Sequence, residues 1–311
     1  MITVNGNSAN EVFVQLCREI LIDASYEVAP RGRPTRESLG AVIELFDPLN
    51  RYVTVKERNL SMVKLVGRMV WELCGHSDLA SIAYYDDQAL RFAGRDGVIA
   101  TAYGARMMVQ MPEIIATLKR DESSRRAVGV ILQPHVDSVT TRLEYPCAIA
   151  THYLIRNRKL NCITYMRSES VWGVLPYDLA MFTLFQEYVA HSLGIAVGSY
   201  VHFMGSAHIY GGEIARANTV ADAETEPPTA FFAGFPSIDF LRGAEAAIRV
   251  DGMLPSHEQA IVEANHASGW AQAVMLLAVD AFRRRGERCK LFERLLTPSW
   301  LDGLKGDDKH G

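Results

Sequence analysis

The sequence lacks most features that mark secreted, metal-binding and membrane-spanning proteins. Its five cysteines, an odd number, are widely scattered and include no C-x-x-C pair, which argues against a zinc ribbon or a disulfide framework. The histidines show no metal-ligand spacing, so no metal is expected. The first 30 residues hold no basic segment followed by an apolar one, and the longest apolar run, 270–282, is too short to span a bilayer. We therefore expect a cytoplasmic protein without a membrane partner.

An excess of charge of one sign is also missing. The chain has 32 Lys and Arg against 36 Asp and Glu, a net charge of −4, so any phosphate recognition must be local and nucleic acid is not an expected partner. Hydrophobic residues make up 49% and charged residues 22% of the 311 residues. This composition is typical of a globular chain that buries a sizeable core.

Strand-like and helical segments are mixed over residues 1–219, which indicates one α+β domain. The segments expected to be helical are 8–24, 58–75, 106–119 and 176–193, and the expected strands are 39–46, 127–134, 147–155, 160–166 and 199–210. The acidic, proline-containing segment 220–230 is the expected linker. Residues 231–311 are expected to form a helical extension packed on the same domain.

One acidic residue stands out because its neighbours are apolar. Asp178 follows Pro176 by two positions in "RSESVWGVLPYDLA" at 167–180. Burial of a carboxylate without partners is costly, so Asp178 is expected either to cap a helix or to face a ligand that hydrogen-bonds to it.

Two further places could carry chemistry. Cys147 follows Pro146 at the start of an expected strand, where a thiol can face a cleft, although its position alone favours a small core residue. His208 and Tyr210 are two residues apart on a strand, so both can hydrogen-bond a sugar hydroxyl or form a half-buried pair with each other.

Arginines cluster in three loops, and guanidinium groups bind phosphate oxygens in pairs. These arginines are Arg31 and Arg33, Arg125 and Arg126, and Arg167. Singly, each is more often a solvated surface residue. They form an anion site only if the fold brings them together.

Seven segments, taken in order, resemble the thymidylate synthase superfamily, which includes the cytidylate and deoxycytidylate 5-hydroxymethylases. They are "DPLNRYVT", "WELCG", "AYGAR", "LKRDESSRR", "YPCA", "KLNCITYMRSESVWGVLPYDLAMFTLF" and "VGSYVHFMGSAHIY". The resemblance covers about residues 31–216. It implies an α+β fold with a large twisted mixed sheet, flanking helices and two subunits packed back to back through their sheets.

The same resemblance implies roles for single residues. Cys147 falls on the nucleophile that attacks C6 of a pyrimidine, and Tyr103 on a tyrosine near it. The residues implied to bind the 5′-phosphate are Arg31 or Arg33, Arg167 with Ser168, and, across the dimer, Arg125 and Arg126. His208 and Tyr210 fall on the pair that binds the sugar. Trp71 and Ser170 fall in the part of the site that binds the folate cofactor.

Asp178 falls where thymidylate synthases carry an asparagine that reads uracil and cytosine-specific members carry an aspartate. Uracil offers an N3–H donor and an O4 acceptor, which an amide matches. Cytosine offers an amino donor at N4 and an acceptor at N3, so a carboxylate can accept from N4 while a shared proton satisfies N3. Against uracil, the same carboxylate would oppose O4. The implied substrate is therefore CMP or dCMP.

Three positions depart from the family pattern. Arg68 stands where the family has a catalytic glutamate, and Glu72, one turn further along the same helix face, is a candidate replacement. Ser170 replaces the aspartate that binds the pterin of folate, and Ala148 replaces a histidine after the nucleophile. The nucleotide half of the site thus matches the family, whereas the half for folate and proton transfer departs from it.

The leading interpretation is a homodimeric transferase that hydroxymethylates CMP or dCMP at C5 through a Cys147–C6 adduct, with 5,10-methylenetetrahydrofolate as cofactor. Two alternatives stay open. One is a folate-independent C5 modification of a cytidine nucleotide, because attack at C6 alone makes C5 nucleophilic. The other is a nucleotide-binding pseudoenzyme in which Arg68 marks the loss of turnover.

Overall fold

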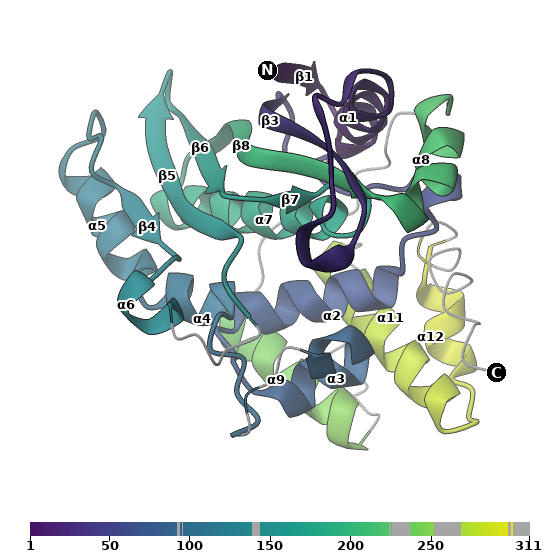
Figure 1. Cartoon of the computed structure of the whole chain (residues 1–311). Coiled ribbons are helices and arrows are strands. Elements are labelled where there is room, and N and C mark those ends of the chain that lie inside the picture. Colours follow the sequence, from purple (N-terminus) through teal and green to yellow (C-terminus); the bar gives the residue numbers. More distant parts are fainter. Residues whose placement is uncertain are drawn as a thin grey trace. The chain divides into compact units, whose positions relative to one another are not determined.

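A computed structural model describes residues 1–91, 94, 96–138, 144–223, 225, 237–251, 269–297 and 300 of the chain (Figure 1). The chain divides into two compact units. The sheet unit comprises Met1–Asn59 and Arg106–Pro228, and the helical unit comprises Leu60–Ala105 and Thr229–Gly311. Residues 60–105 thus group with the C-terminal region, which differs from the division expected from the sequence. Residues 224 and 226–230 of the expected linker lie outside the described residues.

In the described part of the sheet unit, eight strands form one mixed sheet, which agrees with the expected α+β fold (Figure 1). The strands are β1 Ile2–Gly6, β2 Tyr26–Val28, β3 Thr35–Leu45, β4 Val128–Val130, β5 Ala148–Arg156, β6 Lys159–Met166, β7 Glu169–Ser170 and β8 Ala196–Tyr210. Their order is β1-β3-β8-β6-β5-β4, with β2 paired to β3 and β7 to β8. The β1–β3, β6–β8 and β7–β8 pairs are parallel, and the other pairs are antiparallel. The long strand β8 therefore contacts β3, β6 and β7.

Helices cover one face of this sheet. They are α1 Ala9–Asp23, α5 Met111–Arg120, α7 Leu175–Leu193 and α8 Ile214–Ala221. A further short helix, α6 Pro134–Asp137, follows β4. Helix α1 packs on β1, β3 and α8, and α7 packs on β6 and β8. Because side chains alternate along a strand, the β8 residues Tyr200, His202 and Met204 all point to the covered face and are buried. The core of this unit therefore contains polar groups of β8 as well as apolar side chains.

The opposite face carries a row of exposed apolar side chains. Phe203 of β8 pairs with Tyr165 of β6, Tyr165 pairs with Ala150 of β5, and Ala150 pairs with Val130 of β4. Phe203, Tyr165 and Val130 are 40%, 37% and 46% exposed. The rings of Tyr165 and Phe203 stack, with centroids 5.7 Å apart and planes 10° apart. We call this set the apolar row.

Most expected elements are confirmed, but the helix predicted at 106–119 is wrong. Two helices occupy the region, α4 Tyr103–Met108 and α5 Met111–Arg120. Pro112 lies in the first turn of α5, where its missing N–H is tolerated, whereas inside one continuous helix it would remove a hydrogen bond and clash with the preceding turn. The turn between β5 and β6 uses two left-handed residues, Asn157 and Arg158, with φ of 50° and 59°.

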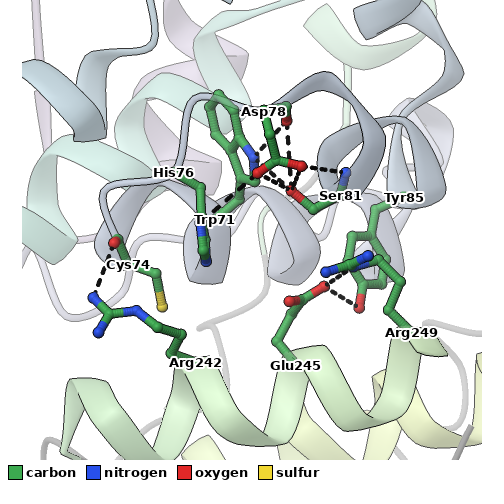
Figure 2. Close-up of polar contacts among 9 residues, drawn as sticks. All are labelled: Trp71, Cys74, His76, Asp78, Ser81, Tyr85, Arg242, Glu245 and Arg249. Carbon is green, nitrogen blue, oxygen red and sulfur yellow. Dashed lines mark hydrogen bonds and ion pairs between the residues drawn. The ribbon is translucent and has the colours of Figure 1, made fainter. Parts of the chain in front are cut away.

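The described part of the helical unit contains α2 Met62–Leu73, α3 Leu79–Tyr85, α9 Ile238–Asp251, α11 Gly269–Arg284 and α12 Lys290–Leu295. Helix α2 packs on α3, α9 and α11. Figure 2 shows polar contacts of these helices. Asp78 caps α3 by accepting from Ser81 N at 2.8 Å. Glu245 of α9 accepts from Tyr85 Oη of α3 at 3.2 Å and from Arg249 Nε at 2.9 Å. Among the described helices, none combines the length and the apolar character that crossing a bilayer requires.

Candidate active site

Cys147 lies immediately before β5, where one arginine holds it in place. Arg167 Nε donates to the carbonyl of Pro146 at 2.8 Å, and its Nη2 donates to the carbonyl of Tyr145 at 2.9 Å. The same Nη2 lies 3.5 Å from Cys147 Sγ. The two carbonyls restrain the guanidinium, so its charge stays at the sulfur. This is the arrangement expected for a positioned nucleophile.

The environment of the Cys147 thiol contains charges of both signs. Burial raises the pKa of this thiol to about 11, Arg167 and Arg31 act to lower it, and Glu169 and Asp178 act to raise it. The thiol is therefore protonated near neutral pH. Attack on a ring carbon requires that the proton leave the sulfur as the bond forms.

Asp178 does not cap a helix. The N-cap of α7 is Val174, which has no capping side chain, and Asp178 lies in the first turn with its own N–H donating to the carbonyl of Val174 at 3.1 Å. Its side chain is buried, with the residue 2% exposed. The sequence offered two roles for Asp178, a helix cap or a carboxyl group that faces a ligand. Because it is not a cap, only the second role is compatible with the geometry.

Asp178 belongs to a buried group of polar side chains that the sequence did not predict. Its carboxyl group is hydrogen-bonded to that of Glu169. Glu169 Oε2 lies 3.2 Å from His202 Nε2, and His202 Nδ1 lies 2.7 Å from Tyr200 Oη. Burial raises the pKa of Glu169 to about 8 and lowers the pKa of His202 to about 4. At neutral pH, therefore, Glu169 holds a proton and His202 is uncharged.

The two N-terminal arginines both lie at this site, so neither is excluded as a phosphate ligand. Arg31 is exposed in a short turn with φ of 53°, and its charge acts on Cys147. The guanidinium of Arg33 lies 3.7 Å from the centroid of the Tyr210 ring. The rings of His208 and Tyr210 are 4.9 Å apart at 84°. Burial lowers the pKa of His208, with Arg33 and Arg167 acting in the same direction.

Arg125 and Arg126 lie elsewhere in the sheet unit. Both are exposed in the segment between α5 and β4. They line a separate pocket together with Glu113, Thr117, Arg120, Asp121, Ser123 and Ser124. Their expected role across a dimer requires a second subunit.

Ser168 and Ser170 flank Glu169 at β7, and Ser170 pairs with His208 of β8. Nearby, a Cβ placed on Gly173 would lie 3.1 Å from Ser170 Oγ and 3.4 Å from Glu213 Oε1. Burial raises the pKa of the Glu213 carboxyl. A hydroxyl and a half-buried carboxyl group thus pack closely around Gly173, where a larger side chain would be crowded.

Three expected site residues belong to the helical unit. Trp71 is buried in an apolar cluster, and its indole N–H donates to Asp78 O at 3.2 Å and Ser81 Oγ at 3.1 Å (Figure 2). Glu72 is buried and accepts from the N–H of Gly104. That bond fixes the start of α4, where Tyr103 is the first residue.

Arg68, at the position of the family glutamate, is also accounted for inside the helical unit. Its Nη1 pairs with Asp86 Oδ2 at 2.9 Å, and Lys64 pairs with Asp86 Oδ1 at 2.8 Å. Asp86 is 2% exposed. Arg68 therefore balances the charge of the buried Asp86 carboxylate. As an arginine, it cannot take over the role of the family glutamate at this position.

Sequence comparison gives two findings. A model of the family described as "Thymidylate synthase" matches residues 11–238. A similar protein is the deoxyuridylate hydroxymethyltransferase of Bacillus phage SP01, which is 28% identical over 228 residues, 68% of this chain and 59% of the relative. The chain thus spans less than two thirds of the length of that relative.

Proposed function

Because this chain belongs to the thymidylate synthase family, we propose that it transfers a hydroxymethyl group to C5 of CMP or dCMP through a covalent bond between Cys147 and C6 of the base. The observation that carries the choice of base is the buried, non-capping carboxyl group of Asp178 beside the thiol. A buried carboxyl pair that holds a proton can both accept from an exocyclic amino group and donate to a ring nitrogen. The name of the similar phage protein supports hydroxymethyl transfer, although its base is uracil.

In the proposed reaction, the Cys147 thiol gives its proton to water as sulfur attacks C6, and the electron pair of the C5–C6 double bond makes C5 nucleophilic. After C5 has received the new group, its original proton leaves, and expulsion of the Cys147 thiolate restores the C5–C6 double bond. Arg167, held by the carbonyls of Tyr145 and Pro146, stabilises the developing thiolate. Asp178 holds the N3–N4 edge and so orients C6 toward the sulfur. The family resemblance adds Tyr103 near the reacting atoms, and Glu72 remains a candidate for proton transfer, although it already accepts from Gly104.

The phosphate and the sugar have their own proposed ligands. Arg167 with Ser168, Arg31 and Arg33 would bind the phosphate from one subunit, and Arg125 and Arg126 from the partner. His208 and Tyr210 would bind the sugar. The charges of Arg33 and Arg167 both act on His208, as does that of Glu37 in the opposite sense. This supports a position for the two arginines next to the proposed sugar site.

The residues near Gly173 fit the proposed cofactor, 5,10-methylenetetrahydrofolate. The side chains of Ser170 and Glu213 both lie against Gly173, and a carboxyl group with a hydroxyl can bind the donor edge of a pterin even though the family aspartate is replaced. When bound, the cofactor supplies the one-carbon unit that C5 receives. Trp71 stays a proposed contact on the resemblance alone.

A homodimer is the proposed assembly. The apolar row of Phe203, Tyr165 and Val130 lies on the sheet face opposite the helices described for the sheet unit. Contiguous exposed apolar side chains mark interaction surfaces. A second copy packed on this face would cover them, as the family's back-to-back arrangement implies.

The test is to incubate the protein with C5-tritiated CMP or dCMP, with and without methylenetetrahydrofolate, and to follow tritium release and product mass. A product heavier by one CH2O unit, formed only with folate, supports the proposal. Tritium release without folate would replace it by a folate-independent modification. Absence of release, together with nucleotide binding that survives Cys147→Ala, would replace it by a nucleotide-binding pseudoenzyme.

A further inference from the structure

Glu169 enters the function proposed above only as the second member of the carboxyl pair, and no task of its own has been assigned to it there. Glu169 is 1% exposed, is hydrogen-bonded to Asp178, and acts electrostatically on Cys147. Oxygen atoms of both carboxyl groups, Glu169 Oε1 and Asp178 Oδ2, are shielded from solvent. Two carboxylates in direct contact in such a place cannot both be ionised, so the pair holds a proton near neutral pH.

Hydrogen bonds from β8 approach Glu169 from one side. The hydroxyl of Tyr200 lies 2.7 Å from His202 Nδ1. Neutral histidine carries a single N–H. We assign the Tyr200 hydroxyl as the donor to Nδ1, which leaves the histidine proton on Nε2, 3.2 Å from Glu169 Oε2. Glu169 thus has a fixed donor at one oxygen, and its other oxygen is left for the proton that it shares with Asp178.

The titratable and charged groups around Glu169 come from four segments. They are Asp178 on α7, His202 and Tyr200 on β8, Cys162 on β6, and Cys147 with its partner Arg167 beside β5 and β7. In this set the cation is held at the sulfur of Cys147. The proton, rather than a cation, therefore balances the charge of the carboxyl pair.

We propose that Glu169 is a specificity-determining positioning residue, which shares one proton with Asp178 and thereby lets Asp178 both donate to N3 and accept from N4 of cytosine. The inference rests on the proposed function, because it assumes that Asp178 faces the base. It assigns a task to a residue that acts on the substrate only through Asp178.

The proton balance is simple. Before binding, one proton lies in the hydrogen bond between Glu169 and Asp178. When cytosine binds, that proton moves to the hydrogen bond between Asp178 and N3, the other oxygen of Asp178 accepts from the N4 amino group, and Glu169 becomes the ionised partner that accepts from His202 Nε2. If the carboxyl pair carries one proton before binding, nucleotide binding exchanges no proton with solvent. If the pair is fully ionised before binding, one proton must be taken up from solvent when the nucleotide binds.

The first test measures the affinity for CMP and dCMP between pH 7 and 9.5 in full-length protein that carries Cys147→Ser, which removes the thiol titration. The matched pair of variants is Glu169→Gln and Glu245→Gln. Both replace a buried carboxyl by an amide, but Glu245 lies in the helical unit, bonded to Tyr85 and Arg249 (Figure 2). In the parent protein, which retains Glu169, we expect the affinity for CMP and dCMP to fall above about pH 8. In Glu169→Gln, we expect the affinity at pH 7.5 to be about tenfold lower and its fall with pH to begin at a lower pH. The Glu245→Gln profile should match that of the parent.

The second test needs no variant of the pair. Calorimetric titration of the Cys147→Ser protein in buffers of different ionisation enthalpy gives the protons taken up per nucleotide. Uptake should be near zero at pH 7, where the nucleotide phosphate is already ionised, and should approach one at pH 9.5. This measurement decides the question if Glu169→Gln fails to fold.

The outcomes separate the two levels of the hypothesis. If CMP and dCMP do not bind, or if uridine nucleotides bind more tightly, the proposed function fails. If cytidine nucleotides bind but show no proton uptake up to pH 9.5, or if a folded Glu169→Gln protein retains both the affinity and the pH profile of its parent, the role of Glu169 is overturned while the proposed function stands.

Discussion

Two sets of buried carboxyl groups, one in the helical unit and one beside the thiol of the sheet unit, have different partners. In the helical unit, Asp86 pairs with Arg68 and Lys64, and Glu245 pairs with Arg249. In the sheet unit, beside the thiol, Asp178 and Glu169 contact each other and a neutral histidine. A carboxylate that is paired with a cation stays ionised and holds the structure together, whereas a carboxyl that is paired with another carboxyl keeps a proton that it can give up. Perturbed protonation of the second kind is typical of functional sites.

The largest effect should come from the thiol that the carboxyl pair faces. Cys147→Ser replaces the nucleophile by a hydroxyl that ionises far less readily, so tritium release from C5-labelled cytidine nucleotide should fall by about 10³-fold or more. The nucleotide affinity should change little. A residual rate within tenfold of the parent would show that the covalent bond is not part of the reaction.

The next effect should come from the base-facing member of the pair. Asp178→Asn supplies a fixed amide donor and acceptor, so the ratio of cytidine to uridine nucleotide affinity should fall about 10- to 100-fold. Competition binding between CMP and UMP, and between dCMP and dUMP, measures this ratio. An unchanged preference for cytosine would remove Asp178 from base recognition.

The comparison between the units also makes a prediction about stability. The pKa of Glu169 is raised to about 8 by burial, above the value of about 4.3 for an unfolded glutamate. Between these pH values the unfolded chain releases a proton that the folded chain keeps, so the free energy of unfolding falls as pH rises from about 4 to about 8. Glutamine does not titrate, so Glu169→Gln removes this pH-dependent loss. Between pH 5 and pH 8, the free energy of unfolding of the variant should therefore rise by on the order of 2–4 kcal/mol relative to that of the parent.

Urea denaturation at the two pH values measures this difference. Glu245→Gln, which breaks a pair with a cation, should instead destabilise by about 1–3 kcal/mol at both. If both variants lose stability equally at pH 8, the distinction between the two kinds of carboxyl pair is wrong.

The smallest effect should come from the far end of the hydrogen-bonded chain. Tyr200→Phe removes the donor to His202 Nδ1 and frees the histidine to change tautomer, so cytidine affinity should fall about threefold at neutral pH. Tyr153→Phe is the matched control, because Tyr153 is a buried tyrosine of β5 whose position pairs with Cys162 of β6. If cytidine affinity falls equally in the two variants, the effect of Tyr200→Phe is that of losing any buried hydroxyl, and the hydrogen bond to His202 has no specific role.

Much of the sheet and part of the site could be predicted from the sequence. The strands follow the expected alternation, and the thiol after Pro146 and the acid in an apolar segment stand out as local anomalies. Asp178 is conspicuous because its neighbours in sequence are apolar, and Arg167 because it begins the same motif. In the structure Arg167 lies at the Cys147 thiol, and both residues act electrostatically on it, whereas their roles remain predictions.

The buried partners of Asp178 could not be predicted in the same way. Glu169 lies among polar neighbours in "RSES", and Tyr200 and His202 look like ordinary strand residues. Their meeting depends on three segments that are brought together by the pairing of β7 with β8 and the packing of α7 on β8. The one sequence signal was the alternation in "SYVHF", which places Tyr200 and His202 on the covered face of the strand.

Glu72 illustrates a different limit. Helix periodicity places it on the same face as Arg68, which makes it a candidate replacement for the family glutamate. Periodicity does not show that its carboxylate meets the N–H of Gly104, because that residue lies 32 positions later in a segment without a helical or strand pattern of its own.

The apolar row has a consequence for how stability should be measured. If a second copy covers Phe203, Tyr165 and Val130, association and folding are linked by mass action, and the thermal midpoint rises with protein concentration. Dilution would then weaken the chain without any change in sequence, pH or ligand. Two laboratories that work at different concentrations would report different stabilities for the same molecule, and both would be right.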